Sequence, residues 1–142
     1  MLNKKEHVYC NLLRRLAAIF YDCLLLTAIL FVATAILVSL IGGNAIEGGN
    51  IVYNAFLLLV SFFYFSWHWV KGGQTLGMRS WHIFVMDESM QVLNWKQASL
   101  RFLYALLSLL LLGLGFAWSC FDKKKYALHD RLSKTCLIVT KN

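Results

Sequence analysis

Residues 16–41 read LAAIFYDCLLLTAILFVATAILVSLI, and Asp22 is the one charged side chain in this run. Residues 51–70 read IVYNAFLLLVSFFYFSWHWV and contain no Asp, Glu, Lys or Arg. A helix needs about 20 apolar residues, each rising ~1.5 Å, to cross the ~30 Å hydrocarbon core of a membrane. Both runs are long enough, so we expect spanning helices over 16–41 and 51–70, joined by the Gly-rich segment 42–50.

The composition indicates an integral membrane protein. Of the 142 residues, 59% are hydrophobic and 15% are charged, whereas soluble domains average about 45–50% and about 25%. This balance excludes a disordered chain, a disulfide-stapled secreted module and an ordinary cytosolic enzyme, and the length fits one domain over 1–142. A cleaved signal peptide is disfavoured, because Asp22 interrupts the apolar run and the run continues past the cleavage-like triplet at 33–35.

The basic residues predict the orientation of the chain. All 14 Lys and Arg residues fall in the segments 1–15, 71–101 and 122–142, while 42–50 has none and carries Glu47. Under the positive-inside rule the three basic segments are cytoplasmic and 42–50 is the outer loop. The basic residues behind the net charge of +7 are then separated from one another by membrane segments. Nucleic-acid binding requires them together on one face. We expect anionic lipid headgroups as partners and no nucleic acid.

The third apolar run, residues 102–121, conflicts with this topology if it crosses the membrane once. A single crossing would place the basic tail, 122–142, outside the cell, against the positive-inside rule. The Gly-Leu-Gly triplet at 113–115 lies near the middle of the run, where glycine weakens a helix. A re-entrant hairpin over 97–112 and 116–128 would return the tail to the cytoplasm. We favour the hairpin, and a plain third span is the alternative.

Short β-strands are predicted on the cytoplasmic side. Residues 81–86 (WHIFVM) alternate with a period of two, 87–90 resemble a turn, and 91–95 (QVLNW) would form the second strand of a hairpin. A hairpin alone is marginally stable in water, so we expect the β-rich segment 135–140 (TCLIVT) to add a third strand. The predicted fold is therefore an α-helical integral membrane protein with two spanning helices, a third apolar segment that re-enters or crosses, and a small cytoplasmic β-unit.

Three short motifs resemble, in order and spacing, those of the RDD family of bacterial membrane proteins. They are RRLAAIFYD at 14–22, GGQTLGM at 72–78 and FDKKKYALHDRLSKTCLIV at 121–139. The resemblance covers about residues 12–140, nearly the whole chain. It implies a location in the bacterial inner membrane and a link to transport across it.

The resemblance also assigns positions to the family's motif residues. The matching residues are one arginine, two aspartates and a Gly-x-Thr-x-Gly loop: Arg15, Asp22, Asp130, Gly73, Thr75 and Gly77. The family usually carries lysine directly after this loop, where this chain has Met78, and Arg79 is the nearest residue that could replace that lysine. Any role tied to the lysine therefore lacks support here.

Asp22 is the most informative single residue, because it lies about 10 Å inside the inner end of the first expected helix. An isolated charge at that depth costs on the order of a few kcal/mol, so Asp22 must face protein or water, or be protonated. It is either a site for protons or small cations, or a buried carboxyl group that holds the helices in register. Arg15 shares its helical face but reaches toward the interface, so we expect Arg15 to bind a tail acid such as Asp130.

The second helix offers possible partners for Asp22. Asn54, Ser61 and His68 recur every seven residues and form one stripe, and Ser61 or Tyr64 would lie level with Asp22 in an antiparallel pair. Such a stripe is typical of helix packing, and the alternative is a polar pathway. His68 is either a group that titrates near neutral pH or a hydrogen-bonding residue at the interface.

The sequence contains no constellation for catalysis or metal binding. The four cysteines form no CxxC motif, no His/Cys pair has zinc-ligand spacing, and no glycine loop fits a nucleotide pattern. We therefore expect no enzyme activity, no metal and no cofactor. Two spans and a hairpin cannot enclose a water-lined route, so the expected function is transport of a small ion or solute by a homo-oligomer, with cation/proton exchange at Asp22 as one form. The alternative is a non-transporting scaffold or assembly partner.

Overall fold

The first two apolar runs form two long helices in the computed structural model, which describes residues 7–110, 130 and 132–140. Helix α1 spans Leu12–Leu40 and helix α2 spans Ile51–Gly72. Each begins after an asparagine, Asn11 or Asn50, whose side chain accepts hydrogen bonds from the first backbone N–H groups. Both helices are long and apolar enough to cross a membrane. The described chain is thus mostly helical, as the sequence predicts.

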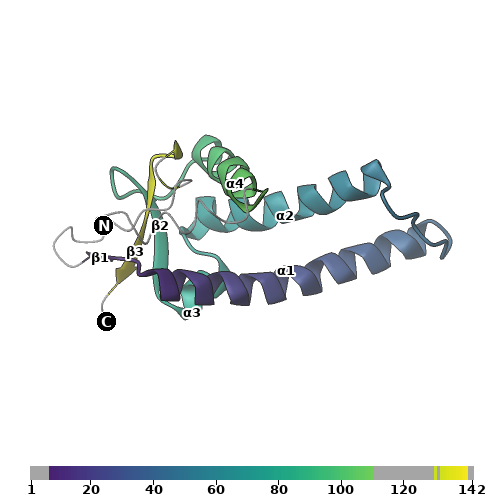
Figure 1. Cartoon of the computed structure of the whole chain (residues 1–142), viewed down its shortest axis with the longest axis horizontal. Helices are drawn as coiled ribbons and strands as arrows, with labels where there is room; N and C mark the ends of the chain where they lie inside the picture. Colours follow the sequence, from purple (N-terminus) through teal and green to yellow (C-terminus); the bar gives the residue numbers. More distant parts are fainter. Residues whose placement is uncertain (1–6, 111–129, 131, 141–142) are drawn as a thin grey trace.

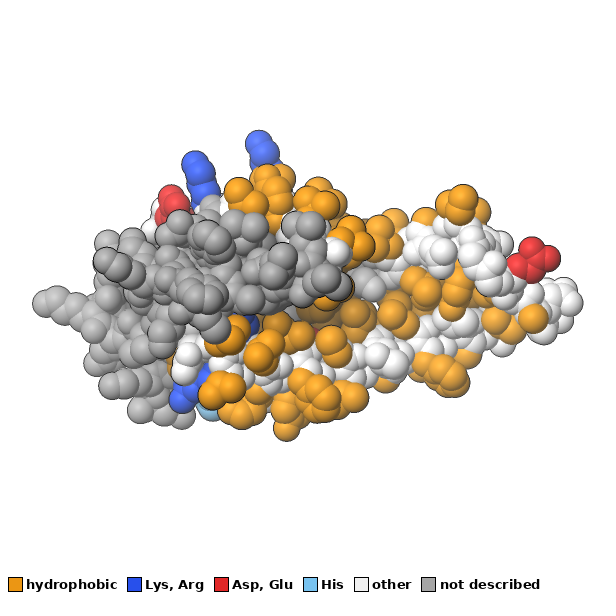
Figure 2. Space-filling model, in the orientation of Figure 1, with side chains coloured by type: hydrophobic (Ala, Val, Ile, Leu, Met, Phe, Trp, Pro, Cys, Tyr) orange, Lys and Arg blue, Asp and Glu red, His pale blue; other side chains and the backbone are white. Residues whose placement is uncertain are grey.

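The outer surface of these helices is apolar. Helices α1 and α2 run side by side from the sheet to their connecting loop at the far end (Figure 1). Away from the sheet, the Thr34 and Tyr53 hydroxyls join them through a hydrogen bond of 2.9 Å. Hydrophobic side chains are spread along both long helices on the face that Figure 2 shows, whereas the Lys and Arg side chains lie toward the end that carries the sheet. Apolar surface of this extent is typical of a protein embedded in lipid.

A three-stranded antiparallel sheet lies across one end of the two helices (Figure 1). Its strands are β1 (His7–Tyr9), β2 (Ile83–Asp87) and β3 (Thr135–Thr140), in the order β1-β3-β2. Ile83 pairs with Val139 and Asp87 with Thr135. Strand β1 pairs with the other edge of β3, Tyr9 opposite Ile138, so the sheet brings the two ends of the chain together. The predicted strand at 135–140 is confirmed, and it is the central strand of the sheet.

The predicted hairpin partner at 91–95 is wrong. Two local hydrogen-bond systems occupy that segment instead of a strand ladder. The Asp87 carboxylate accepts the N–H groups of Ser89 and Gln91 at 2.8 and 2.9 Å and closes a turn. Asn94 and Gln97 then exchange hydrogen bonds of 2.9 and 3.1 Å in a capping box that starts a helix. The third strand is supplied by β1, in the N-terminal segment for which no strand was predicted.

Two shorter helices connect the sheet to the long ones. Helix α3 (Leu76–Ser80) packs against α1, and helix α4 (Trp95–Leu110) packs against α2. The segment 71–101, predicted as a β-hairpin, therefore contains α3, one strand and the start of α4. Helix α4 also includes the first nine residues of the third apolar run. The rest of that run, including the predicted hairpin turn at 113–115, lies outside the described residues, as does most of the tail.

The main core lies where the sheet meets the helices. The alternation of β2 and β3 sends one set of side chains into this core and the other set to the opposite face of the sheet. The core combines residues of the sheet, both long helices, α3, α4 and two connecting segments: Cys10, Ala18, Trp69, Met78, Ile83, Val85, Leu93, Ala98, Leu137 and Val139. Met86, Cys136 and Ile138 form a second cluster on the other face. Burial is thus concentrated at the sheet end of the molecule.

Candidate functional site

Helix α1 buries one polar face near its beginning. Arg15, Ala18 and Asp22 are its buried residues, and their spacing of three and four residues places them on one face. This agrees with the shared face predicted for Arg15 and Asp22. Because α3 packs against this part of α1, the face is covered by protein, and each polar group on it requires a partner.

Three hydrogen-bond donors surround the Asp22 carboxylate, which is 4% exposed. The Tyr64 hydroxyl and the Gly77 backbone N–H donate to Oδ1, each at 3.0 Å. The Thr75 hydroxyl donates to Oδ2. The predicted bond from Tyr64 is therefore present. Ser61, the other predicted partner, donates instead to the Leu57 carbonyl oxygen at 2.9 Å.

The loop Gly73–Gly77 is shaped to reach Asp22. Gly73 ends α2 with a left-handed backbone (φ 63°), and its carbonyl oxygen accepts the Val85 N–H at 2.7 Å. The Gln74 side chain donates to the Ile83 carbonyl oxygen at 2.9 Å, so both residues cover the outer edge of β2. Thr75 then caps α3 by accepting a hydrogen bond from the Met78 N–H at 3.2 Å.

Gly77 is the point of closest approach between this loop and α1. A Cβ atom on Gly77 would lie 2.3 Å from the Ala18 carbonyl oxygen and 2.8 Å from the Asp22 carboxyl carbon. Glycine therefore allows the backbone of α3 to lie directly on α1, where the Gly77 N–H reaches Asp22. The Gly-x-Thr-x-Gly pattern thus supplies a helix end, a hydroxyl donor and a close backbone contact.

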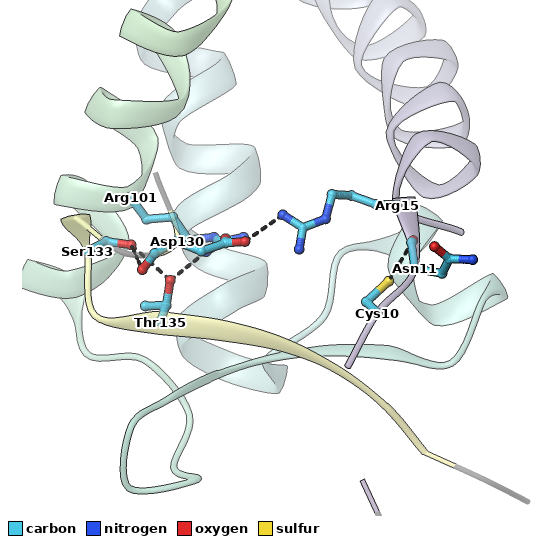
Figure 3. Close-up of polar contacts among 7 residues, drawn as sticks. All are labelled: Cys10, Asn11, Arg15, Arg101, Asp130, Ser133 and Thr135. Atoms are coloured by element: carbon cyan, nitrogen blue, oxygen red, sulfur yellow. Dashed lines mark hydrogen bonds and ion pairs between the residues drawn. The ribbon is translucent and has the colours of Figure 1, made fainter. Parts of the chain in front are cut away.

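The second polar cluster is built around Asp130 (Figure 3). Arg15 contacts Asp130 Oδ2 through Nη1 at 2.5 Å, and Arg101 contacts Oδ1 through Nη1 at 2.6 Å. These three side chains are at most 5% exposed. Arg101 also donates to the Thr135 hydroxyl at 2.5 Å, and Ser133 hydrogen-bonds Thr135 at 2.8 Å. The predicted pair of Arg15 and Asp130 is present, and one carboxylate is shared by arginines from α1 and α4.

A sequence profile described as RDD family matches residues 9–134. The chain belongs to the RDD family. No curated protein and no solved structure matches the chain. RDD is a membrane-associated family, in agreement with the two apolar helices. The matched range includes Asp22 with its three partners, and also Arg15, Arg101 and Asp130.

Sequence reasoning missed Arg101, the residue that completes the Asp130 cluster of this RDD protein. Burial lowers the pKa of the Arg101 guanidinium, and the neighbouring Asp130 carboxylate opposes that change. The available signal was its position: Arg101 is the last charged residue before the apolar run 102–121, on a helical face with the small residues Ala98 and Ala105. The prediction included it only as part of the cytoplasmic basic segment 71–101 and gave it no partner.

The remaining predicted residues of the RDD chain lie apart from the Asp22 carboxylate. Asn54 is exposed on α2. His68 contacts the Tyr64 ring, with centroids 4.8 Å apart, and its Nδ1 hydrogen-bonds the Tyr64 carbonyl oxygen at 2.6 Å. Met78 is buried in the main core, while Arg79 is exposed. Arg79 therefore does not replace the buried side chain at position 78.

The chemistry available at Asp22 follows from its neighbours. Its three partners, the Tyr64 and Thr75 hydroxyls and the Gly77 N–H, all donate hydrogen bonds to the Asp22 oxygens. Among the described residues, no group of three or more His, Cys, Asp or Glu side chains could hold a metal ion. The site joins α1, α2 and the Gly73–Gly77 loop through one buried carboxyl group.

Proposed function

We propose that this RDD protein acts as a homo-oligomer in the bacterial inner membrane and moves a small ion or solute across it. The observation that carries the proposal is the buried carboxylate of Asp22 in a helix long enough to span the membrane. Ionisable groups at such positions are costly and are typically placed on ion or solute pathways. Asp22 would be the polar centre of the pathway, and cation/proton exchange is one form of the activity.

Two features of the Asp22 site support an exchange step. Two of its three donors are hydroxyls, from Tyr64 on α2 and Thr75 in the loop, and hydroxyls can reorient and accept as well as donate hydrogen bonds. The same Thr75 hydroxyl also accepts the Met78 N–H and so caps α3. Protonation of Asp22 would thus be coupled to the position of α3 against α1.

An oligomer supplies what one chain lacks. The apolar surfaces of α1 and α2 are largely uncovered in the described residues, and two helices cannot enclose a route for water. Further copies would provide the remaining walls, with lipid covering the outside. The basic segments 1–15, 71–101 and 122–142 would contact anionic headgroups on the cytoplasmic side.

A scaffold or assembly partner is the second candidate, and a specific observation favours it. All three donors around Asp22 come from the same chain and already occupy both of its oxygens. A carboxyl group with this set of partners can have a purely structural role and hold α1, α2 and the loop in register. The two candidates differ in what Asp22→Asn should do.

Proteoliposomes separate the two functions. The purified protein would be reconstituted with a pH-sensitive dye inside and given Na⁺, K⁺ or anion gradients. Transport predicts flux in the wild type and loss of flux in Asp22→Asn, with the oligomer intact by size-exclusion chromatography. Glu88→Gln, which neutralises an exposed acid, is the matched control and should keep the wild-type flux. If the wild type shows no flux and Asp22→Asn fails to assemble, the transport proposal is rejected and the scaffold function is supported.

The orientation of the chain is tested by cysteine labelling in intact cells. Single cysteines would replace Ile46 or Lys124 in a variant without the four native cysteines. We expect an impermeant maleimide to label position 46 only, since the positive-inside rule places 42–50 outside and the tail inside. Labelling at position 124 would contradict a cytoplasmic tail and support a plain third span.

A further inference from the structure

Two tryptophan side chains are exposed near the sheet end of the long helices. Trp67 on α2 is 53% exposed, and Trp81, which directly follows α3, is 37% exposed. Tryptophan is highly buried on average, so two exposed indole rings require an explanation. In a membrane protein such rings lie at the level of the lipid headgroups, where the ring contacts apolar chains and the N–H meets polar groups.

A basic side chain lies near each of these tryptophans. Lys71 Nζ lies 5.5 Å from the centre of the Trp67 ring, in a cation–π contact on the surface of α2. Arg79 is exposed on α3, two residues before Trp81. Residues 67–82 contain no Asp or Glu, so this stretch has no acid of its own to balance the two positive charges. Its charge is complementary to anionic headgroups, whose phosphates are strong acceptors for lysine and arginine.

Helix α3 has a buried side and an exposed side. Gly77 and Met78 are buried, whereas Leu76, Arg79 and Ser80 are exposed. The exposed side thus combines an apolar side chain with a basic one. Arginine at a membrane surface keeps its charged group among the headgroups while its stem lies along apolar surface. The exposed side of α3 therefore fits the boundary between lipid chains and headgroups.

The packing of α3 on α1 fixes the level of this surface along the membrane helices. The Gly77 N–H and the Tyr64 hydroxyl donate to the same oxygen of Asp22, each at 3.0 Å, and α3 lies beside the sheet end of α1 (Figure 1). Trp67 and Lys71 follow Tyr64 by three and seven residues, which is about 4.5 Å and about 10.5 Å further along α2 toward the sheet. A charged side chain that faces hydrocarbon is costly, so the exposed arginine of α3 marks the inner boundary of the membrane.

The lengths of the two spanning helices agree with a boundary at this level. Residues 23–40 of α1, beyond Asp22, extend about 27 Å, and residues 51–67 of α2 extend about 25 Å. Both lengths are close to the hydrocarbon thickness of about 30 Å. Asp22 then lies at the inner edge of the hydrocarbon, although α1 begins at Leu12.

We propose that the exposed side of α3 and the last two turns of α2 form a docking surface for anionic lipid headgroups. The surface consists of Trp67, Lys71, Leu76, Arg79 and Trp81. Lys71 and Arg79 bind lipid phosphates, while the two indole rings and Leu76 contact the adjoining part of the acyl chains. The proposal deepens the lipid contact of the proposed function, on which it rests for its partner alone, and requires neither transport nor an oligomer.

The test is the quenching of tryptophan fluorescence by brominated lipids, with the full chain in bilayers of phosphatidylglycerol and phosphatidylcholine. Either lipid would carry the bromine, which quenches the tryptophans that the lipid contacts. At equal mole fractions, we expect brominated phosphatidylglycerol to quench more strongly than brominated phosphatidylcholine. The double variant Trp67→Phe, Trp81→Phe should lose most of this difference, because the reporters next to the two bases are removed.

Charge variants locate the surface. Lys71→Gln and Arg79→Gln change exposed side chains, so both should keep the wild-type fold by circular dichroism. Each should lower the affinity for phosphatidylglycerol relative to phosphatidylcholine about fivefold. Lys134→Gln removes an exposed base outside the surface and is the matched control, which should keep the wild-type preference.

Three results would overturn the proposal: equal quenching by the two lipids, a difference that survives in the double tryptophan variant, or a preference that Lys134→Gln lowers as much as Arg79→Gln does. Ion flux measured in the same bilayers is a separate readout. Absence of flux with an intact lipid preference would reject transport and leave the docking surface in place.

Discussion

Gly77→Ala should be among the most destabilising single-methyl additions in this protein. The new Cβ would lie 2.3 Å from the Ala18 carbonyl oxygen, and a relaxed contact requires about 3.4 Å, so α3 and α1 must separate by about 1 Å. That movement strains the core by about 1–3 kcal/mol. It also lengthens the hydrogen bond from the Gly77 N–H to Asp22. A hydrogen bond to a charged acceptor contributes about 1.5–3 kcal/mol to stability. We expect a total loss of about 3–5 kcal/mol in unfolding free energy.

The assay is equilibrium unfolding in detergent, monitored by tryptophan fluorescence. Gly72→Ala is the matched control, because a Cβ at Gly72 meets nothing within 4 Å, and its stability should stay within about 0.5 kcal/mol of wild type. The contact is with the backbone of Ala18, so adding Ala18→Gly should not rescue Gly77→Ala. If Gly77→Ala and Gly72→Ala have the same free energy of unfolding, α3 does not approach α1 as closely as the structure shows.

Further predictions concern the two clusters and the start of α4. Asp130→Asn should cost about 3–5 kcal/mol in unfolding free energy, because it leaves two buried arginines without their shared carboxylate; a cost below about 1 kcal/mol would contradict the buried pairs. Thr75→Val should cost about 2–3 kcal/mol by removing both the α3 cap and a donor to Asp22, whereas Thr75→Ser should retain most of the stability. Asn94→Ala should cost about 1 kcal/mol and reduce helicity measured by circular dichroism, with Gln97→Ala as a weaker counterpart in the same capping box.

The shared carboxylate also changes what charge reversal can show. Exchange of the charges of Arg15 and Asp130 would place an arginine at position 130, opposite Arg101. The exchanged pair should therefore remain unstable, even though Arg15 and Asp130 are in contact in the wild type. A double-mutant cycle of Asp130→Asn with Arg15→Gln, and another with Arg101→Gln, measures the two pairs separately.

The two long helices, the buried face of α1 and the strand at 135–140 could be predicted from the sequence, because each depends only on neighbouring residues. The spans of α1 and α2 follow from the length of two apolar runs, since a helix of fixed rise must cross a fixed thickness of hydrocarbon. The buried face of α1 follows from helical spacing, which places Arg15 and Asp22 together. The strand at 135–140 follows from its β-branched residues.

The tertiary structure decided the partners. A pattern of alternating residues specifies a strand but not its neighbour, and β3 pairs with β1 and β2 while the 91–95 segment is used by a capping box. Asp22 and Asp130 each required buried partners. These partners come from distant parts of the chain: Thr75 and Gly77 contact Asp22, and Arg101 contacts Asp130. Sequence alone therefore determined that these carboxylates must be satisfied, because an isolated charge cannot be buried. Only the folded chain decided which groups satisfy them, because that depends on which distant segments the sheet and α3 bring to α1.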